Sequence, residues 1–195
     1  LDLAEVKEIK KKLGGTLNDV VLATVTGAVR RFLEGRGVGV DELPFRAQVP
    51  MNIRTAEEHG DLGNRVVILL ADLPVAEADP RERYQKVSAT MEQIKSSHQA
   101  KGAELLEKIG DWTAKEFLGA LARITGRQLA YNIVVTNVPG PPFPVKLLGA
   151  RMTEMYPLVP LFSNQALGVA LFSYDGGLFW GLDADWDAMP DLHDF

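Results

Sequence analysis

The longest unbroken run of apolar residues in this chain covers only residues 66–71. A helix that crosses a bilayer needs about 20 apolar residues, so this run predicts a strand buried on both faces and not a membrane span. Residues 45–54 alternate between apolar and polar side chains, which predicts a second strand with one apolar face. Between residues 80 and 127 the spacing of apolar residues predicts two or three helices and no strand. The chain is therefore expected to fold as α/β, with a mixed sheet flanked by helices, in one domain.

The first part of the chain predicts two helices. A short lysine-rich helix is expected over residues 2–12, ended by the glycines at 14 and 15. Thr16 is then the predicted N-cap of the next helix, and Asp19 completes a capping box, although Glu or Gln is more usual there. Apolar residues recur every three or four positions along that helix, in a broad stripe that predicts deep packing (Val21, Leu22, Val25, Ala28, Val29, Phe32 and Leu33).

The last third of the chain predicts more strands. One is expected over residues 131–138, and residues 146–155 are read as another. The clearest local pattern is a hairpin, with strands over 166–174 and 178–185 joined by the turn Asp-Gly-Gly at 175–177. These strands complete the expected mixed sheet.

Composition narrows the possible functions. The formal net charge of −5 argues against a general nucleic-acid binder, which needs a basic face to meet phosphates. The chain has no cysteine, which removes disulfides, thiolate nucleophiles and thiolate metal sites together. It begins with Leu1 and ends just after a new helix is expected near residues 189–190. We therefore expect a fragment of a longer protein. We expect that protein in the cytoplasm, either free or in peripheral contact with the inner membrane or with lipid droplets.

Taken by themselves, the residues present no complete active site. None of the three histidines has a neighbour in a recognisable catalytic arrangement, and each is expected in solvent (His59, His98 and His193). The Gly-x-Ser-x-Gly, phosphate-loop and His-Glu-x-x-His patterns are also absent from the sequence. A solvated turn explains the carboxylates at 183, 185 and 187 better than a metal site does, so no metal is expected.

Four segments carry a more specific signal, because their order and spacing match one family. Residues 16–23 contain an Asn-Asp pair at a helix start, and residues 136–141 read Thr-Asn-Val-Pro-Gly-Pro, with threonine in place of the usual serine. Each of the other two segments is discontinuous. One covers residues 49–54 and 62–64. The other covers residues 156–158, 164–167, 173–176 and 181–185. Together the four segments resemble the C-terminal half of the bacterial wax ester synthase/diacylglycerol acyltransferase family.

That resemblance implies the two-halved fold of chloramphenicol acetyltransferase and other coenzyme A-dependent acyltransferases, with residues 1–195 as the C-terminal half. It implies transfer of a fatty acyl group from acyl-CoA, as a substrate, to diacylglycerol or a long-chain alcohol, with no cofactor. The family's His-His-x-x-x-Asp-Gly motif belongs to the N-terminal half, so the general base is expected there. Asp175-Gly176 is not its remnant, because no histidine precedes it at the right spacing. The expected partners are the chain's own N-terminal half, acyl-CoA and the lipid alcohol.

The family motifs imply two supporting catalytic residues, Asn18 and Asp19, at a channel between the halves. The structural alternative is that both residues fix the start of the helix, and capping explains Asp19 well. Asn18 lies on the inward stripe of that helix, where a buried amide must find hydrogen-bond partners whatever else it does.

The substrate-binding residues are expected at the channel wall or at the contact between the halves (Thr136, Asn137, Pro139, Gly140 and Arg54). For the first four, the alternative is a rigid turn, because prolines restrict φ. Arg54 shares a polar strand face with Gln48 and Asn52, and this face meets either coenzyme A phosphates or water. The helix that contains Trp112 either touches a lipid surface or packs in the core.

Two rivals remain for the function. One is another acyltransferase of the same fold, of the condensation or polyketide-linked kind, in which the Asn-Asp and Asn-Val-Pro-Gly-Pro pair is not expected in this form. The other is a non-catalytic lipid-binding or interaction module. The sequence upstream of Leu1 discriminates between a module and an enzyme half, because the histidine motif is expected there.

Overall fold

The computed structural model describes residues 1–52, 66–106, 131–161 and 165–195. Predictions about Arg54, His59 and the helix with Trp112 fall outside these residues. Within them, the elements follow one another along the chain as α1 Leu3–Leu13, α2 Leu17–Gly35, β1 Arg46–Asn52, β2 Val66–Asp72, α3 Pro80–Leu106, β3 Ile133–Pro139, β4 Lys146–Leu147, β5 Ala150–Arg151, β6 Leu167–Tyr174, β7 Gly177–Ala184 and the short 3-10 helix η2 Leu192–Asp194. The predicted α/β fold is confirmed.

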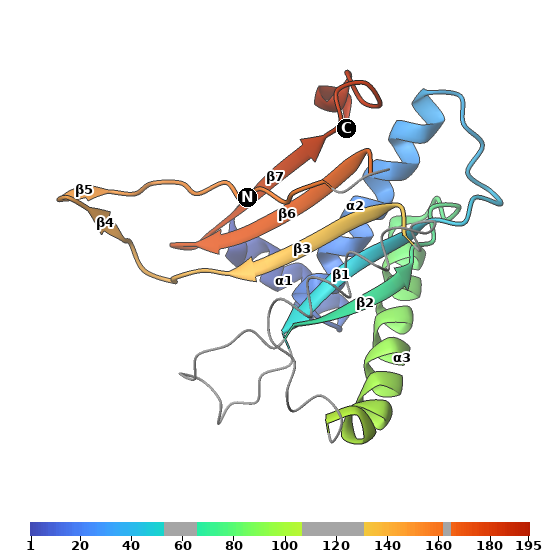
Figure 1. Cartoon of the computed structure of the whole chain (residues 1–195), viewed down its shortest axis with the longest axis horizontal. Helices are drawn as coiled ribbons and strands as arrows, with labels where there is room; N and C mark the ends of the chain where they lie inside the picture. The colour runs from blue at the N-terminus through green and yellow to red at the C-terminus, as the bar shows by residue number, and fades with distance from the viewer. Residues whose placement is uncertain (53–65, 107–130, 162–164) are drawn as a thin grey trace.

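A five-stranded mixed sheet forms the centre of the molecule, with the strand order β2-β1-β3-β6-β7 (Figure 1). The two hairpins, β1–β2 and β6–β7, are antiparallel, while β1–β3 and β3–β6 are parallel. The parallel pairs join the two hairpins into one sheet, so β3 lies between elements that are distant in sequence. Strand β1 pairs with the N-terminal end of β3, while β6 pairs with β3 from Val134 to Pro139.

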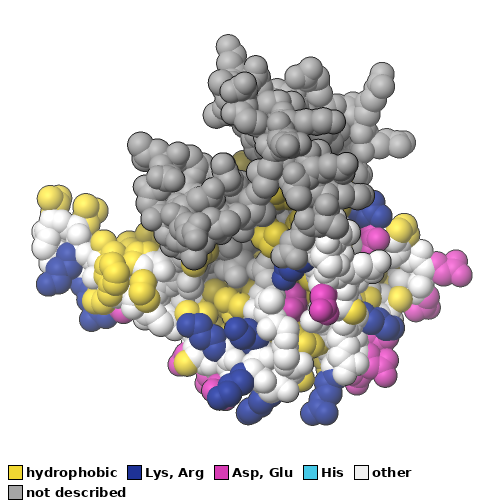
Figure 2. Space-filling model, turned by 90° about the horizontal axis from the view of Figure 1, so that it is seen from below, with side chains coloured by type: hydrophobic (Ala, Val, Ile, Leu, Met, Phe, Trp, Pro, Cys, Tyr) yellow, Lys and Arg dark blue, Asp and Glu magenta, His cyan; other side chains and the backbone are white. Residues whose placement is uncertain are grey.

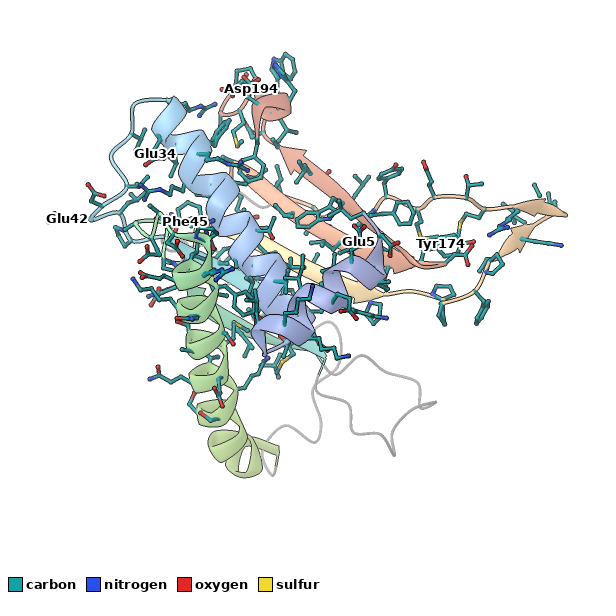
Figure 3. The ribbon with its side chains drawn as sticks, turned by 180° about the vertical axis from the view of Figure 1, so that it is seen from behind. Glu5, Glu34, Glu42, Phe45, Tyr174 and Asp194 are labelled. Atoms are coloured by element: carbon teal, nitrogen blue, oxygen red, sulfur yellow. The ribbon has the colours of Figure 1, made fainter. Side chains whose placement is uncertain are left out.

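Helices α1, α2 and α3 cover one face of this sheet (Figures 1 and 3). The side chains that alternate toward them from the strands are buried with the inner side of α2, as its broad apolar stripe predicts. The core between the two layers includes Val21, Leu22, Val25, Ala47, Val49, Leu69, Ile133, Val135, Val169 and Leu171. In the part of the chain that the structure covers, no helix is both long and apolar enough to cross a membrane.

The strand predictions need three corrections. Strand β2 lies at the edge of the sheet and Leu70 is 39% exposed, so the expectation of burial on both faces is wrong. Gln48, expected to meet water or coenzyme A, is buried, because β1 runs inside the sheet between β2 and β3. The single strand predicted over 146–155 is instead the two short strands β4 and β5, which pair with each other.

Residues 141–155, called the arm from here on, leave the sheet after β3 and project well beyond it, at the left of Figure 1. The buried Tyr174 of β6 holds the base of the arm, because its hydroxyl accepts from the Val145 amide and donates to the Met152 carbonyl, both at 2.8 Å. Both sides of the arm are thus attached to one side chain.

The chain returns from the arm along the sheet face opposite the helices. There the Val159 amide donates to Asp183 Oδ2 at 2.9 Å. A Cβ atom at Gly181 would overlap the carbonyl group of Pro157, and one at Gly168 would press on the Val159 side chain. The two glycines therefore let this return segment lie directly on β6 and β7, which fixes where the arm begins and ends.

Candidate active site

The first turn of α2 is fixed by a reciprocal capping box. Thr16 Oγ1 accepts from the Asp19 amide at 3.3 Å, and Asp19 Oδ2 accepts from the Thr16 amide at 2.7 Å. The two bonds satisfy main-chain donors that a helix start leaves without partners. The predicted box is confirmed, and it holds Asn18, which lies between its two members, in a defined place.

The two family motifs meet at this helix start. The side-chain amide Nδ2 of Asn137 donates to Oδ1 of Asn18 at 3.2 Å, across 119 positions of sequence. Asn137 reaches the helix side of the sheet because it follows Ile133 and Val135 in the alternation of β3, and both of those residues are in the core. Both asparagines are half-buried, so the pair lies between the core and the surface.

The direction of this bond defines what Asn18 can offer to a ligand. Its Oδ1 is occupied by Asn137, and its Nδ2 has no acceptor among the residues that the structure describes. A side-chain amide carries two N–H donors, and a substrate carbonyl or a developing oxyanion is a suitable acceptor for them. Asn18 is therefore arranged as a hydrogen-bond donor.

Asp19 has a more structural environment. Its side chain is buried, and beside the capping bond its Oδ2 accepts from Ser88 Oγ of α3 at 3.4 Å. Its Oδ1 is buried without a hydrogen-bond partner in the described part of the chain. The described contacts of Asp19 thus join the start of α2 to α3, and a supporting role in catalysis stays a prediction.

Tyr84 and Ser88 of α3 complete this environment and were not predicted as site residues. The Tyr84 hydroxyl donates to the Gly14 carbonyl, and burial, followed by the nearby charge of Asp19, raises the pKa of this phenol. Tyr84 lies on the buried side of α3, but the pairing of α3 with the start of α2 is a tertiary contact that no local sequence pattern contains.

The remaining predicted residues of the β3 motif have different surroundings. Thr136 is half-buried and alternates to the opposite sheet face from Asn137, while Pro139 is exposed. The Gly140 amide donates to the Ser173 carbonyl at 2.9 Å, and a Cβ atom there would overlap the ring of Phe172. The contacts of Gly140 are those of the rigid turn that was weighed against a binding role.

Two carboxylates near the C-terminus, Asp183 and Asp185, are used by the fold. Asp183 accepts from the Val159 amide, and Asp185 Oδ1 accepts from the amides of Asp187 and Ala188, both at 3.0 Å. A recess of about 460 Å³ lies at the opposite end of α2 from Asn18, between this helix and the C-terminal residues. Its Arg36 is already paired with Asp191, so we place the candidate site at the Asn18–Asn137 pair.

Known proteins resemble this chain over nearly all of its length. A family model described as the WS/DGAT C-terminal domain matches residues 62–195. A Mycobacterium tuberculosis protein named as a diacylglycerol O-acyltransferase is 34% identical over 197 residues, which cover 98% of this chain and 39% of that protein. The O-acyltransferase WSD of Acinetobacter baylyi is 31% identical, over 97% of this chain and 41% of its own length. The chain thus spans about 40% of the length of these relatives.

Two solved structures share the fold. The wax ester synthase/diacylglycerol acyltransferase from Marinobacter aquaeolei VT8 matches with a TM-score of 0.73 at 25% identity, over 98% of this chain and 43% of that one. The first condensation domain of the CDA synthetase matches with a TM-score of 0.52 at 16% identity, over 93% of this chain and 37% of that one. The second likeness extends to the fold alone.

Proposed function

The chain belongs to the wax ester synthase/diacylglycerol acyltransferase family, and from this premise we propose that it is the C-terminal half of an acyl-CoA-dependent O-acyltransferase. The acceptor is diacylglycerol or a long-chain alcohol, and the product is a triacylglycerol or a wax ester. One observation carries the proposal: the Asn-Asp motif and the Asn-Val-Pro-Gly-Pro motif, far apart in sequence, meet through the bond from Asn137 to Asn18.

The reaction needs a base, which we assign to a histidine of the N-terminal half. That imidazole removes the proton of the acceptor hydroxyl, and the oxygen attacks the carbonyl carbon of the thioester. A C–O bond forms, the C–S bond breaks, and the proton passes to the departing thiolate of coenzyme A. After the C–O bond forms and before the C–S bond breaks, the carbonyl oxygen carries negative charge. A fixed N–H donor aimed at this oxygen lowers the activation barrier of the transfer.

Within this scheme Asn18 is the catalytic residue of the chain, and Asn137 is a positioning residue. Asn137 occupies Oδ1 of Asn18, so that the Nδ2 donors of Asn18 are directed toward the reacting oxygen. Pro139 continues the wall from this pair, whereas Thr136 lies on the other face of β3 and Gly140 belongs to the turn that follows the strand. Arg54 contacts the coenzyme A phosphates in the same proposal, and the lipid acceptor brings the protein to a membrane or lipid-droplet surface.

The test is an assay of the full-length protein with palmitoyl-CoA and either hexadecanol or diacylglycerol, followed as ester formed. The Asn18→Ala variant is expected to lose about 100-fold in kcat, as when one oxyanion donor is removed from other acyl-transfer enzymes. The Asn137→Asp variant is the sharper test. A carboxylate at 137 accepts but does not donate, so it turns the Asn18 amide and withdraws the donor while keeping the side-chain volume.

Asn132 provides a matched control, since it lies beside the other end of β3 and its Oδ1 accepts from the Arg46 amide. The Asn132→Ala variant should keep kcat within about twofold at matched folding, because it leaves the Asn18 donor in place. Full turnover by the Asn137→Asp variant would remove the positioning role. If the unmodified full-length protein forms no ester from either acceptor, the acyltransferase proposal itself is wrong and the non-catalytic module becomes the better description.

A further inference from the structure

Helix α1 is rich in lysines that form no ion pair within the described chain. Four of its eleven residues are lysines (Lys7, Lys10, Lys11 and Lys12). No described carboxylate pairs with any of them, although the chain as a whole has a net charge of −5. Figure 2 shows Lys and Arg side chains gathered at the lower left of the molecule, which in that view is the side that carries α1. Cations gathered without counter-ions attract an anion to this surface.

Three of these lysines lie on one side of the helix. Lys7 and Lys11 are exposed and one turn apart, and the half-buried Lys10 lies next to both of them on the helix surface. Gly14, the C-cap, continues the same line, because it is seven positions after Lys7 and three after Lys11. The three lysines, called the lysine stripe below, therefore lead to the loop between α1 and α2.

This loop joins the lysine stripe to the candidate active site. Gly14 and Gly15 both have a positive φ, of 81° and 74°, and α2 with Asn18 starts soon after them. No described atom lies within 4 Å of the position that a Cβ atom would take at Gly14, so the loop is open on that side. The lysine stripe starts beside this opening and recedes from it by roughly 10 Å along the axis of α1 to Lys7.

The helix dipole explains only part of this positive charge. Cations are favoured near the C-terminal end of a helix, and Lys10, Lys11 and Lys12 lie in the last turn of α1. The effect falls off within that turn, so it does not account for Lys7. It also makes no distinction between Lys11 and Lys12, although these neighbours project from different sides of the helix.

We propose that the lysine stripe binds the 3′-phosphate of coenzyme A, while the thioester end of the same molecule lies at Asn18. A phosphate monoester has a charge of about −1.5 to −2 at pH 7, and lysine ammonium groups bind phosphate as point charges. The pantetheine arm separates the phosphates of coenzyme A from its sulfur, and in this arrangement it runs past Gly14. The inference rests on the proposed function, which supplies coenzyme A as the ligand, and it adds to the phosphate contact that was assigned there to Arg54.

An anionic membrane surface fits the lysine stripe less well. A helix that lies on a membrane inserts apolar side chains among its basic ones. The exposed apolar residues of α1 are Ile9 and Leu13, each 45% exposed, and their positions on the helix place them opposite Lys7 and Lys11. The side with the lysine stripe thus offers charge without large apolar side chains to insert, which suits a water-soluble phosphate group.

The experiment measures binding to the full-length protein by isothermal titration calorimetry, with coenzyme A and 3′-dephospho-coenzyme A as the two probes. The unmodified protein is expected to bind coenzyme A at least about tenfold more tightly than the probe without the 3′-phosphate. The double variant Lys7→Ala/Lys11→Ala should raise the Kd for coenzyme A by at least about tenfold. Its Kd for 3′-dephospho-coenzyme A should stay within about twofold of the unmodified protein, because the lost contact is already absent there.

Two further variants control for charge and folding. Lys12→Ala removes a lysine from the same turn but from another side of α1, so the Kd for coenzyme A should stay within about twofold. Lys7→Arg/Lys11→Arg keeps both charges and should keep most of the affinity. The melting temperatures of all these variants should agree closely, because the substituted side chains are exposed.

Several results would overturn the proposal. If the double variant keeps its Kd for coenzyme A, or loses equal affinity for both probes, the lysine stripe does not contact the 3′-phosphate. An equal loss in Lys12→Ala would mean that only the general charge of the helix matters. Binding to vesicles of anionic phospholipid that depends on Lys7 and Lys11, with an unchanged Kd for coenzyme A, would identify the stripe as a membrane contact.

The calorimetric measurement needs no acyl transfer, so this inference and the proposed function can fail separately. Ester formation by the full-length protein, with an unchanged affinity of the double variant for coenzyme A, would contradict the phosphate site alone. Binding of coenzyme A that depends on Lys7 and Lys11, without ester from either acceptor, would contradict the acyl transfer alone.

Discussion

The start of α2 and the tip of the arm differ in how many contacts they make within the described chain. At the start of α2, Asn18 and Asp19 are held by bonds from Asn137, Thr16 and Ser88. At the tip, Leu147 and Leu148 are 75% and 100% exposed. The start of α2 lies beside the C-terminal end of β3, through the bond from Asn137 to Asn18, while the arm leaves the sheet after that end and projects beyond it.

This difference shows where the contacts of each region lie. The polar network at α2 is fixed by hydrogen bonds between residues of the described chain. The arm has an internal base and an external tip, so its geometry is set on one side only. A hydrogen-bond donor that must point accurately at a ligand needs the first kind of support, since a misplaced donor loses most of its value.

Removal of the Asp19 carboxylate is the strongest test of this contrast between the start of α2 and the tip of the arm. The Asp19→Ala variant loses the capping bond to Thr16 and leaves Ser88 without its acceptor, so we expect the free energy of unfolding to fall by about 2–4 kcal/mol. Denaturant unfolding followed by circular dichroism measures this change. The Asp19→Asn variant keeps an acceptor oxygen and should lose less. A loss below about 0.5 kcal/mol for alanine would show that this region is not held as we describe.

The elements that were predicted correctly are those whose signals are local. The Thr16–Asp19 capping box, the end of α1 at Gly14 and the β6–β7 hairpin each depend on residues a few positions apart. Backbone preferences and short-range hydrogen bonds decide such features, and a single sequence displays them directly.

The features that were missed depend on which elements become neighbours. The apolar run at 66–71 looks like a central strand, yet β2 lies at the edge because β3 pairs on the other side of β1. Asn18 and Asn137 were both named as site residues, but only the tertiary structure shows that they touch each other. The segment 146–155 was expected to be one strand, and the positive φ values of its turn are not encoded by the usual Asn-Gly pair.

A second prediction concerns the internal side of the arm. The Tyr174→Phe variant keeps the ring and removes both hydroxyl bonds, to Val145 and Met152, so unfolding should cost about 1–2 kcal/mol less. Hydrogen exchange at the Val145 amide should accelerate more than exchange in β6. Tyr156→Phe is the control, because that exposed hydroxyl bonds only to the exposed Glu154 in the described chain, and its loss should be too small to detect. Equal effects for the two tyrosines would mean that the arm base is not anchored.

The smallest effect expected is a change in how stability depends on pH at the start of α2. Burial, and secondarily the charge of Asp19, raises the pKa of Tyr84 above its ordinary value near 10. The unfolded chain therefore loses this proton at lower pH than the folded chain does. The contribution of Tyr84 to stability is fully present below about pH 10 and is lost as the pH rises through the folded-state pKa.

Tyr84→Phe should flatten the decline of the free energy of unfolding at high pH. At lower pH it should reduce that free energy by a constant amount, because the bond to the Gly14 carbonyl is missing. Asp19→Asn should give an intermediate slope, because it removes the second cause of the raised pKa and leaves the burial. Urea unfolding at intervals from pH 8 to pH 11 measures all three slopes. If the slopes of the unmodified protein and of Tyr84→Phe coincide, the phenol is as solvated in the folded state as in the unfolded one, and the start of α2 is then as open as the tip of the arm.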